Sequence, residues 1–188
     1  MTAAPAGDPL LYNLAGLLAQ PPGSSRTFGI AGVMLDLGPD LSQADPVEGA
    51  VRVARTNRGV LVTGRLTASL DEQCSRCLKE IEVPLELVLE EEVLPGVDIA
   101  TGLRIDTSAE PDVARLTDHH ELDLEPLVRQ AIQLAEPIAP LCRVDCPGLC
   151  PVCGEERAVG DHQHEDVPID PRLLALRDFR VDGEEESE

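Results

Sequence analysis

The chain has almost no aromatic residues and almost no lysine. Tryptophan is absent, one tyrosine and two phenylalanines bring the aromatic content to 2%, and Lys79 is the one lysine beside fourteen arginines. A core within these 188 residues must therefore be built from Leu, Val, Ile and Ala. Aromatic rings on which the bases of a single strand could stack are also scarce, which disfavours that mode of nucleic-acid binding.

Positive charge is the second shortage. Fifteen Lys and Arg stand against 35 Asp and Glu, which gives a net charge of -20. Nucleic-acid affinity comes mostly from Lys and Arg that neutralise phosphates, so a chain this acidic repels RNA unless its arginines cluster. The candidates for such a cluster are Arg52, Arg55, Arg58 and Arg65. We expect direct RNA contact to be weak and a basic protein to be the more natural partner.

Long apolar runs and catalytic motifs are missing too. No stretch reaches the roughly 18 apolar residues of a membrane span, and Met1–Pro9 lacks the basic start of a secretory signal. We therefore expect a cytoplasmic protein with no membrane contact. The chain contains no G-x-S-x-G, P-loop or H-E-x-x-H motif and offers no good nucleophile–base pair, so we expect it not to be an enzyme.

Alternating apolar and polar residues over 47–93 predict antiparallel strands. One strand runs through Val47–Val53, a second through Val60–Leu70 after a turn at 56–59, and a third through Ile81–Leu89. A helix is predicted from Asp123 to Glu136, with Asp123 as its cap and Pro126 tolerated in its first turn. Its apolar stripe is expected to hold Leu124, Leu127, Val128, Ala131, Leu134 and Ala135.

These elements predict an α+β fold: a small antiparallel β-sheet with one packing helix and a C-terminal zinc-bound module. We expect residues 1–46 to be irregular with short elements, one of them a helix or strand near Leu10–Leu18. Residues 47–140 should form the sheet and helix, and 141–180 the zinc-bound module with a short helix from Asp170-Pro171. Residues 181–188 should be a disordered acidic tail.

Every cysteine belongs to a closely spaced pair, and two histidines follow the last pair. The eight donors are Cys74 and Cys77, Cys142 and Cys146, Cys150 and Cys153, and His162 and His164. A tetrahedral structural zinc site takes four Cys or His ligands, so eight donors match two zinc ions per chain. In a chain that is not secreted, such pairs favour metal thiolates over disulfides.

The spacing leaves the division of these donors between two ions open. His162 and His164 follow Cys150-Pro-Val-Cys153-Gly closely enough to complete that site. Cys74 and Cys77 lie in the turn between two predicted strands and need distant partners, which Cys142 and Cys146 could supply. Alternatively Cys146 shares an ion with Cys150 and Cys153. The simpler alternatives are that the cysteines are reduced core residues and the histidines solvated loop residues.

Glutamates line one face of the third predicted strand, at Glu80, Glu82, Glu86 and Glu90. The simplest interpretation is a solvated strand face. The functional alternative is a contact surface for a basic protein, for which Glu82 and Glu86 are the first candidates.

Three segments resemble the YceD family, the large-ribosomal-RNA-subunit accumulation proteins of bacteria and plastids. They are CSRCL at 74–78, LCRVDCPGLCPVCG at 141–154 and IDPRL at 169–173. Many members have C-x-C where this chain has His162-Gln-His164, a change that keeps the capacity to bind zinc. The resemblance implies a factor in the synthesis, processing or stability of large-subunit rRNA.

Such a factor would have a basic large-subunit ribosomal protein or an rRNA-processing factor as its partner, and would act as a zinc-stabilised binding adaptor. Two other functions remain open, a zinc-thiolate redox sensor and a metal-dependent RNA-processing enzyme. A redox sensor would need exposed cysteines of low pKa, and an enzyme would need an open coordination position on zinc.

Overall fold

The computed structural model describes residues 10–106, 108, 110–157 and 170–173. The chain divides into two compact units, Met1–Cys146 and Pro147–Glu188. His162, His164 and the expected tail at 181–188 lie outside the described residues. Of the expected short C-terminal helix, the structure describes a 3-10 turn at Pro171–Leu173. In the described part of the chain, no helix combines the length and the apolar character that crossing a membrane requires.

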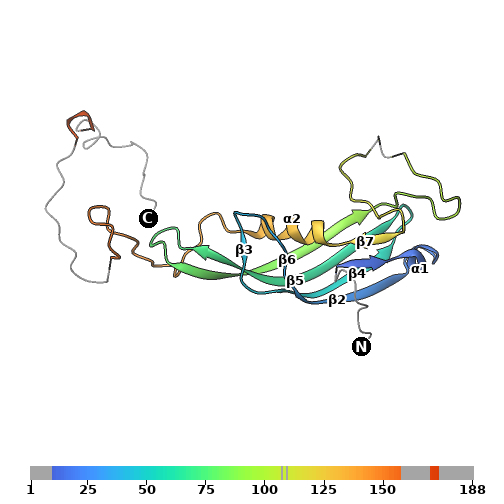
Figure 1. Cartoon of the computed structure of the whole chain (residues 1–188), viewed down its shortest axis with the longest axis horizontal. Helices are drawn as coiled ribbons and strands as arrows, with labels where there is room; N and C mark the ends of the chain where they lie inside the picture. Colours follow the sequence, from blue (N-terminus) through green and yellow to red (C-terminus); the bar gives the residue numbers. More distant parts are fainter. Residues whose placement is uncertain (1–9, 107, 109, 158–169, 174–188) are drawn as a thin grey trace, which may run out of the picture. The chain divides into compact units, whose positions relative to one another are not determined.

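The three predicted strands form the longest part of the sheet in the first unit (Figure 1). They are β4 (Val47–Arg55), β5 (Val60–Gln73) and β6 (Glu80–Val93), and each pairs antiparallel with the next. The turn between β4 and β5 is closed by the Thr56 amide, which donates to the Gly59 carbonyl over 3.0 Å. Gly59 is required there, because a Cβ atom would lie 2.3 Å from the carbonyl oxygen of Val93. The prediction of an antiparallel sheet is therefore confirmed.

Two further strands of this sheet come from the segment 1–46, for which only short elements are expected. The nine-residue strand β2 (Ser25–Val33) pairs antiparallel with β4, and β3 (Ser42–Gln43) pairs with β5. Apart from half-buried Phe28, only Ile30 and Val33 of β2 turn inward. Two glycines and an alanine further weaken its strand signal, because these residues are depleted in strands. Its pairing with β4 therefore decides its conformation.

The segment Leu10–Leu18 forms both a strand and a helix. Strand β1 (Leu11–Asn13) pairs antiparallel with β7 (Glu121–Asp123), and the one-turn helix α1 (Ala15–Leu18) follows directly. The apolar side chains of this region are buried, namely Leu10, Leu14, Leu17 and Leu18. They add aliphatic surface to a core that has almost no aromatic rings.

The predicted helix is α2 (Glu125–Ala135), which packs against β6. Asp123 accepts a hydrogen bond of 2.9 Å from the Glu125 amide and so satisfies one donor of the first turn. The buried residues of the helix are Leu127, Val128 and Ile132. The expectation for Leu134 is wrong, since this side chain is 79% exposed. Ile132, four residues after Val128, is the one that turns toward the sheet.

The sheet has one buried and one open face. The side chains of Val51, Leu66 and Leu87 point to the buried inner face, which also packs against the helices. Their neighbours in sequence point the other way, and we call that side the outer face. Its residues on β4, β5 and β6 include Glu48, Ala50, Arg52, Thr63, Arg65, Thr67, Glu82, Glu86, Val88 and Glu90.

Candidate metal centre

Four cysteine thiols meet at one end of the first unit. Cys74 and Cys77 lie in the turn between β5 and β6, and Cys142 and Cys146 come from the segment that follows α2. The four Sγ atoms all lie within 4.8 Å of one another. The Sγ atoms of Cys74 and Cys146 are 3.8 Å apart, and those of Cys77 and Cys142 are 3.7 Å apart.

The β5–β6 turn folds locally into a tight knuckle. The Cys74 amide donates to the Lys79 carbonyl over 2.8 Å, and the Leu78 amide donates back to the Cys74 carbonyl over 2.9 Å. Leu78 takes a left-handed conformation with φ of 58° to close the turn. This brings the two thiols of the C-x-x-C sequence onto one side of the turn.

Two hydrogen bonds fasten the segment after α2 to this knuckle. The Ser75 amide donates to the carbonyl of Pro140 over 2.9 Å. The Arg76 guanidinium donates to the carbonyl of Cys146, also over 2.9 Å. Pro137 and Pro140 end the helix and turn the chain toward β5 and β6, so that Cys142 and Cys146 face the knuckle.

The spacing of the four sulfurs suits a tetrahedral metal ion. Zinc–thiolate bonds of about 2.3 Å in a tetrahedron place neighbouring sulfurs about 3.8 Å apart. The S–S separations of 3.7 and 3.8 Å agree with that value and are far longer than the roughly 2.05 Å of a disulfide. Cys74, Cys77 and Cys146 are buried, whereas Cys142 is exposed. This cluster could therefore hold a metal ion, and its donor set is consistent with zinc.

The backbone around the cluster lowers the pKa of one thiol, that of Cys74. Backbone N–H groups, above all that of Cys142, lower the pKa of Cys74 to about 6. Hydrogen bonding to Cys146, together with desolvation of the thiol among its three neighbours, raises the pKa of Cys142 to about 12. Thiols this close cannot all ionise without a cation between them, and a divalent metal ion supplies that charge.

Cys150 and Cys153 form a second knuckle with the same backbone pattern in the second unit. The Cys150 amide donates to the Glu155 carbonyl over 2.7 Å, and the Gly154 amide donates to the Cys150 carbonyl over 2.8 Å. Gly154 has φ of 74° at the position that Leu78 occupies in the first knuckle. The backbone amide of Cys153 is the main cause that lowers the pKa of Cys150.

The structure brings together half of the eight predicted ligands. Cys142 and Cys146 join Cys74 and Cys77, which is one of the two divisions that the spacing leaves open. In the other division, Cys146 would share an ion with Cys150 and Cys153, and the first cluster would then have three sulfurs. The Sγ atom of Cys146 instead lies beside that of Cys74. The histidines expected beside Cys150 and Cys153 lie outside the described residues. Their role as ligands therefore remains a prediction.

Arg76 is a residue of this centre that spacing rules do not single out. Its guanidinium bonds the backbone of Cys146 and carries positive charge toward a cluster that becomes anionic when its thiols ionise. The signal was present in the sequence, since Arg76 is the one cation between Cys74 and Cys77.

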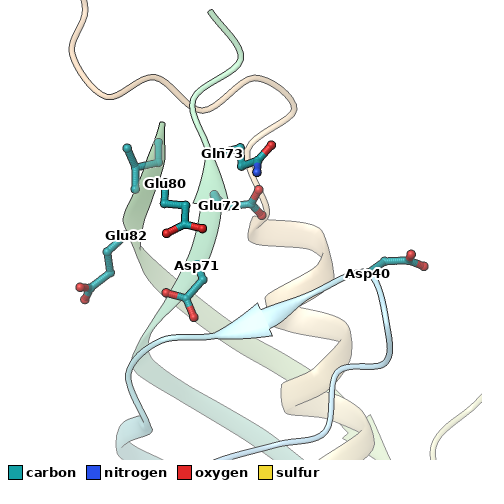
Figure 2. Close-up of a pocket in the computed structure, with 7 residues that line it drawn as sticks. Asp40, Asp71, Glu72, Gln73, Glu80 and Glu82 are labelled. Atoms are coloured by element: carbon teal, nitrogen blue, oxygen red, sulfur yellow. The ribbon is translucent and has the colours of Figure 1, made fainter. Parts of the chain in front are cut away.

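The two predicted partner-binding glutamates lie on the outer face in different concavities. Glu82 lines a cavity of about 760 Å³ at the end of the β5–β6 hairpin, beside Asp71 and Glu80 (Figure 2). It accepts a hydrogen bond of 3.1 Å from the Ser69 hydroxyl. Glu86 lines a second cavity of about 420 Å³ with Glu48 and Val88. The acidic β6 face is thus exposed as predicted.

The hairpin arginines do not form one patch. Arg55 donates to the backbone carbonyls of Thr56 and Gly59, and Arg58 pairs with the Glu110 carboxylate at 2.6 Å. Only Arg52 and Arg65 remain exposed on the outer face. A cluster of four arginines that could neutralise RNA phosphates is therefore absent from this part of the structure.

Comparison with known proteins agrees with these motifs. The profile of the YceD family, described as large ribosomal RNA subunit accumulation protein YceD, matches residues 62–180. Uncharacterized proteins of Mycobacterium tuberculosis and Mycobacterium bovis are 40% identical over 127 residues, which is 67% of this chain and 58% of each relative.

An uncharacterized protein of Mycobacterium leprae is 34% identical over 135 residues, 71% of this chain and 59% of that relative. The chain thus spans less than two thirds of the length of these relatives, and no solved structure matches it. The family match includes both C-x-x-C knuckles and the helix between them. This chain belongs to the YceD family of large ribosomal RNA subunit accumulation proteins.

Proposed function

We propose that this protein is a non-enzymatic adaptor in the accumulation of large-subunit rRNA, stabilised by two zinc ions and bound to a basic ribosomal protein or rRNA-processing factor. The family points to large-subunit RNA. The observation that carries the adaptor role is the acidic outer face of the β5–β6 hairpin. This face is rigidly paired over fourteen residues and tied at its end to the segment after α2.

The zinc part of the proposal rests on the donor set. Four thiols at tetrahedral separation fill the coordination of one ion. The knuckle of Cys150 and Cys153 repeats the backbone hydrogen bonds of the first and would hold the second ion with His162 and His164. The first ion would join two segments that are more than sixty residues apart in sequence, so it contributes to folding directly.

The basic partner follows from charge. The chain has a net charge of -20, and Glu80, Glu82, Glu86 and Glu90 are exposed on one side of β6. Opposite charge attracts a basic surface and speeds its association, whereas RNA phosphates are repelled. The dispersal of the hairpin arginines supports the same choice.

The two alternatives gain no support from this geometry. A metal-dependent RNA-processing enzyme needs an open coordination position, and four thiols leave none on the first ion. A redox sensor needs accessible sulfur, yet three of these four cysteines are buried.

Charge reversal tests the adaptor. The double variant Glu82→Lys, Glu86→Lys should lose most of the basic protein that co-purifies with the wild type at low salt, while its zinc content stays unchanged. Wild-type association should weaken as salt rises, because the attraction is between opposite charges. The matched control is Glu91→Lys with Asp112→Lys, which changes the charge equally at exposed positions off the outer face.

The cellular measurement is the ratio of large-subunit to small-subunit rRNA in cells that carry each variant. We expect the ratio to fall with the Glu82 and Glu86 reversal and to hold with the control. Tight binding to bare large-subunit RNA at physiological salt, indifferent to the reversals, would contradict the adaptor and favour Arg52 and Arg65 as an RNA contact.

A further inference from the structure

The outer face of the sheet is hollowed by two neighbouring concavities that share Arg65 and Val88. One, of about 420 Å³, also includes Glu48, Thr67 and Glu86, and the other, of about 350 Å³, extends over Arg52 and Thr63. Val88 is 67% exposed although it lies in the middle of a fourteen-residue strand. In the described part of the chain, this stretch of β4–β6 has no helix packed over its outer side.

The strand register fixes which groups stand beside one another. Thr67 pairs with Glu48 on β4 and with Glu86 on β6, so two carboxylates flank one row of the groove. Neighbouring strands are about 4.8 Å apart, which separates the two glutamate Cα atoms by about 10 Å. One lysine or arginine side chain entering between them reaches both carboxylates.

The next row has a different character. Arg65 pairs with Ala50 on one side and with Val88 on the other. Among the described residues, neither Arg65 nor the glutamates of the neighbouring row make an ion pair or a side-chain hydrogen bond. The guanidinium repels a cation from this row, while the exposed valine offers an apolar contact. The Arg65–Val88 row is therefore suited to an apolar side chain of a bound partner.

A third row lies four residues along β6 from Glu86. There Glu82 pairs with Asp71, again two carboxylates side by side, about 13 Å from the Glu86 row at the rise of a strand. The outer face therefore presents anionic, anionic and apolar positions in a fixed order, with the two anionic rows four residues apart and the apolar row two residues further.

We propose that this groove binds an extended, basic segment of a partner protein in one register. Basic side chains lie over the Asp71–Glu82 row and the Glu48–Glu86 row, and an apolar side chain lies over Val88. Alternate residues of an extended chain face the sheet every 6–7 Å or so, which makes the recognised sequence basic-x-x-x-basic-x-apolar, or its reverse. The inference rests on the proposed adaptor function and adds the chemical pattern that its partner must carry.

Charge selects this occupant over a second copy of the chain. Two copies face to face would bring a row of glutamates against glutamates and add two net charges of -20. Like charges held opposite one another in a sheet are destabilising. A lysine- or arginine-bearing segment instead relieves the repulsion between the paired carboxylates.

Peptides test the order of the pattern. The probes are two seven-residue peptides, K-S-T-S-K-T-L and its reverse, with a third, K-S-L-S-K-T-T, that moves the leucine between the lysines at identical composition and charge. Fluorescence anisotropy with the full chain should give at least roughly fivefold tighter binding for one of the ordered peptides, about 1 kcal/mol for the apolar contact. Equal affinity for the third peptide, or no binding of either ordered peptide at millimolar concentration, would overturn the groove.

Surface variants locate the contact. Val88→Ser should abolish the preference for the ordered peptide and leave binding of the third peptide unchanged, while Glu86→Gln should weaken both. The control, Glu91→Gln, removes a charge from the same strand at a position that pairs with inward-facing Val62 and should change neither. An ordered preference that survives Val88→Ser refutes the register.

The outcomes for the groove and for the adaptor are separable. Loss of co-purification in the Glu82 and Glu86 reversal, combined with peptides that bind regardless of order, keeps the adaptor and removes the groove. Ordered binding with unchanged co-purification and rRNA removes the adaptor.

Discussion

Cys74 and Cys142 stand in one cluster but hold their protons very differently. The pKa of Cys74 is lowered to about 6 by backbone N–H groups, chiefly that of Cys142, and the pKa of Cys142 is raised to about 12 by its bond to Cys146. For Cys74 the lowered pKa stabilises the metal-free fold fully above the unfolded value near 9, and this contribution is lost as pH falls through 6.

Metal binding should therefore release fewer than four protons from the four thiols at pH 7, since Cys74 is already ionised there. Titration calorimetry with zinc in buffers of different ionisation enthalpy measures this number, best in Cys150→Ser, which leaves one centre. Affinity should fall as pH is lowered toward 6, because protons then compete for Cys74 as well. Release of four protons per zinc ion at pH 7 would contradict the lowered pKa of Cys74.

Cys77→Ser should disturb the hairpin end and the segment after α2 together. Losing one of four ligands frees a long loop that the ion closes, so amide exchange should rise at least about tenfold there, or ~1.4 kcal/mol. Cys153→Ser is the matched variant in the second knuckle and should affect only the unit Pro147–Glu188. Equally local effects of both changes would argue against an ion shared between distant segments.

Helix α2 shows how narrow the buried stripe of a short helix is. Val128 and Ile132 are fully buried against the sheet, whereas Leu134, two residues further on, is 79% exposed. Two residues rotate a helix by about 200°, which carries Leu134 to the opposite side. The helix therefore attaches through one stripe, and its apolar residues are not equivalent.

Ile132→Ala should lower the free energy of unfolding by about 2–5 kcal/mol, because it leaves a cavity against β6. Leu134→Ala makes a comparable truncation on the same helix and should stay within about 0.5 kcal/mol of the wild type. Urea unfolding of both variants with metal bound checks the pair. A similar loss in the free energy of unfolding for the two variants would mean that Leu134 is buried in solution.

The molecule as a whole carries one knuckle in each of its two units. Cys74 and Cys77 belong to the unit Met1–Cys146, and Cys150 and Cys153 to the unit Pro147–Glu188. Both have the same pair of backbone hydrogen bonds and a left-handed residue after the second cysteine. The repetition is the structural reason to expect two metal sites in place of one.

Protein purified without chelator should contain about two zinc ions per chain by metal analysis, since each knuckle holds half of a four-ligand site. Cys74→Ser and Cys150→Ser should each reduce the content by about one ion. A value near zero with free thiols contradicts both sites, and a value near one that only Cys74→Ser removes leaves the first centre alone.

Local patterns in the sequence determined much of this protein. Alternation predicts β4, β5 and β6 and their exposed glutamates, because neighbouring side chains of a strand point to opposite faces. The C-x-x-C spacing places Cys74 and Cys77 in a turn, and the prolines after Ala135 end α2. Each of these signals acts within a few residues, so it can be interpreted without the fold.

Tertiary structure alone decided what depends on distant contacts. β2 and β7 become strands because β4 and β1 pair with them, and their own residues give little alternation. Which cysteines share an ion depends on the direction that the chain takes after α2. Because α2 packs on β6, the Sγ atom of Cys142 lies 3.7 Å from that of Cys77. The groove at Val88 likewise needs three strands in register, because Glu48 and Glu86 become neighbours only through Thr67.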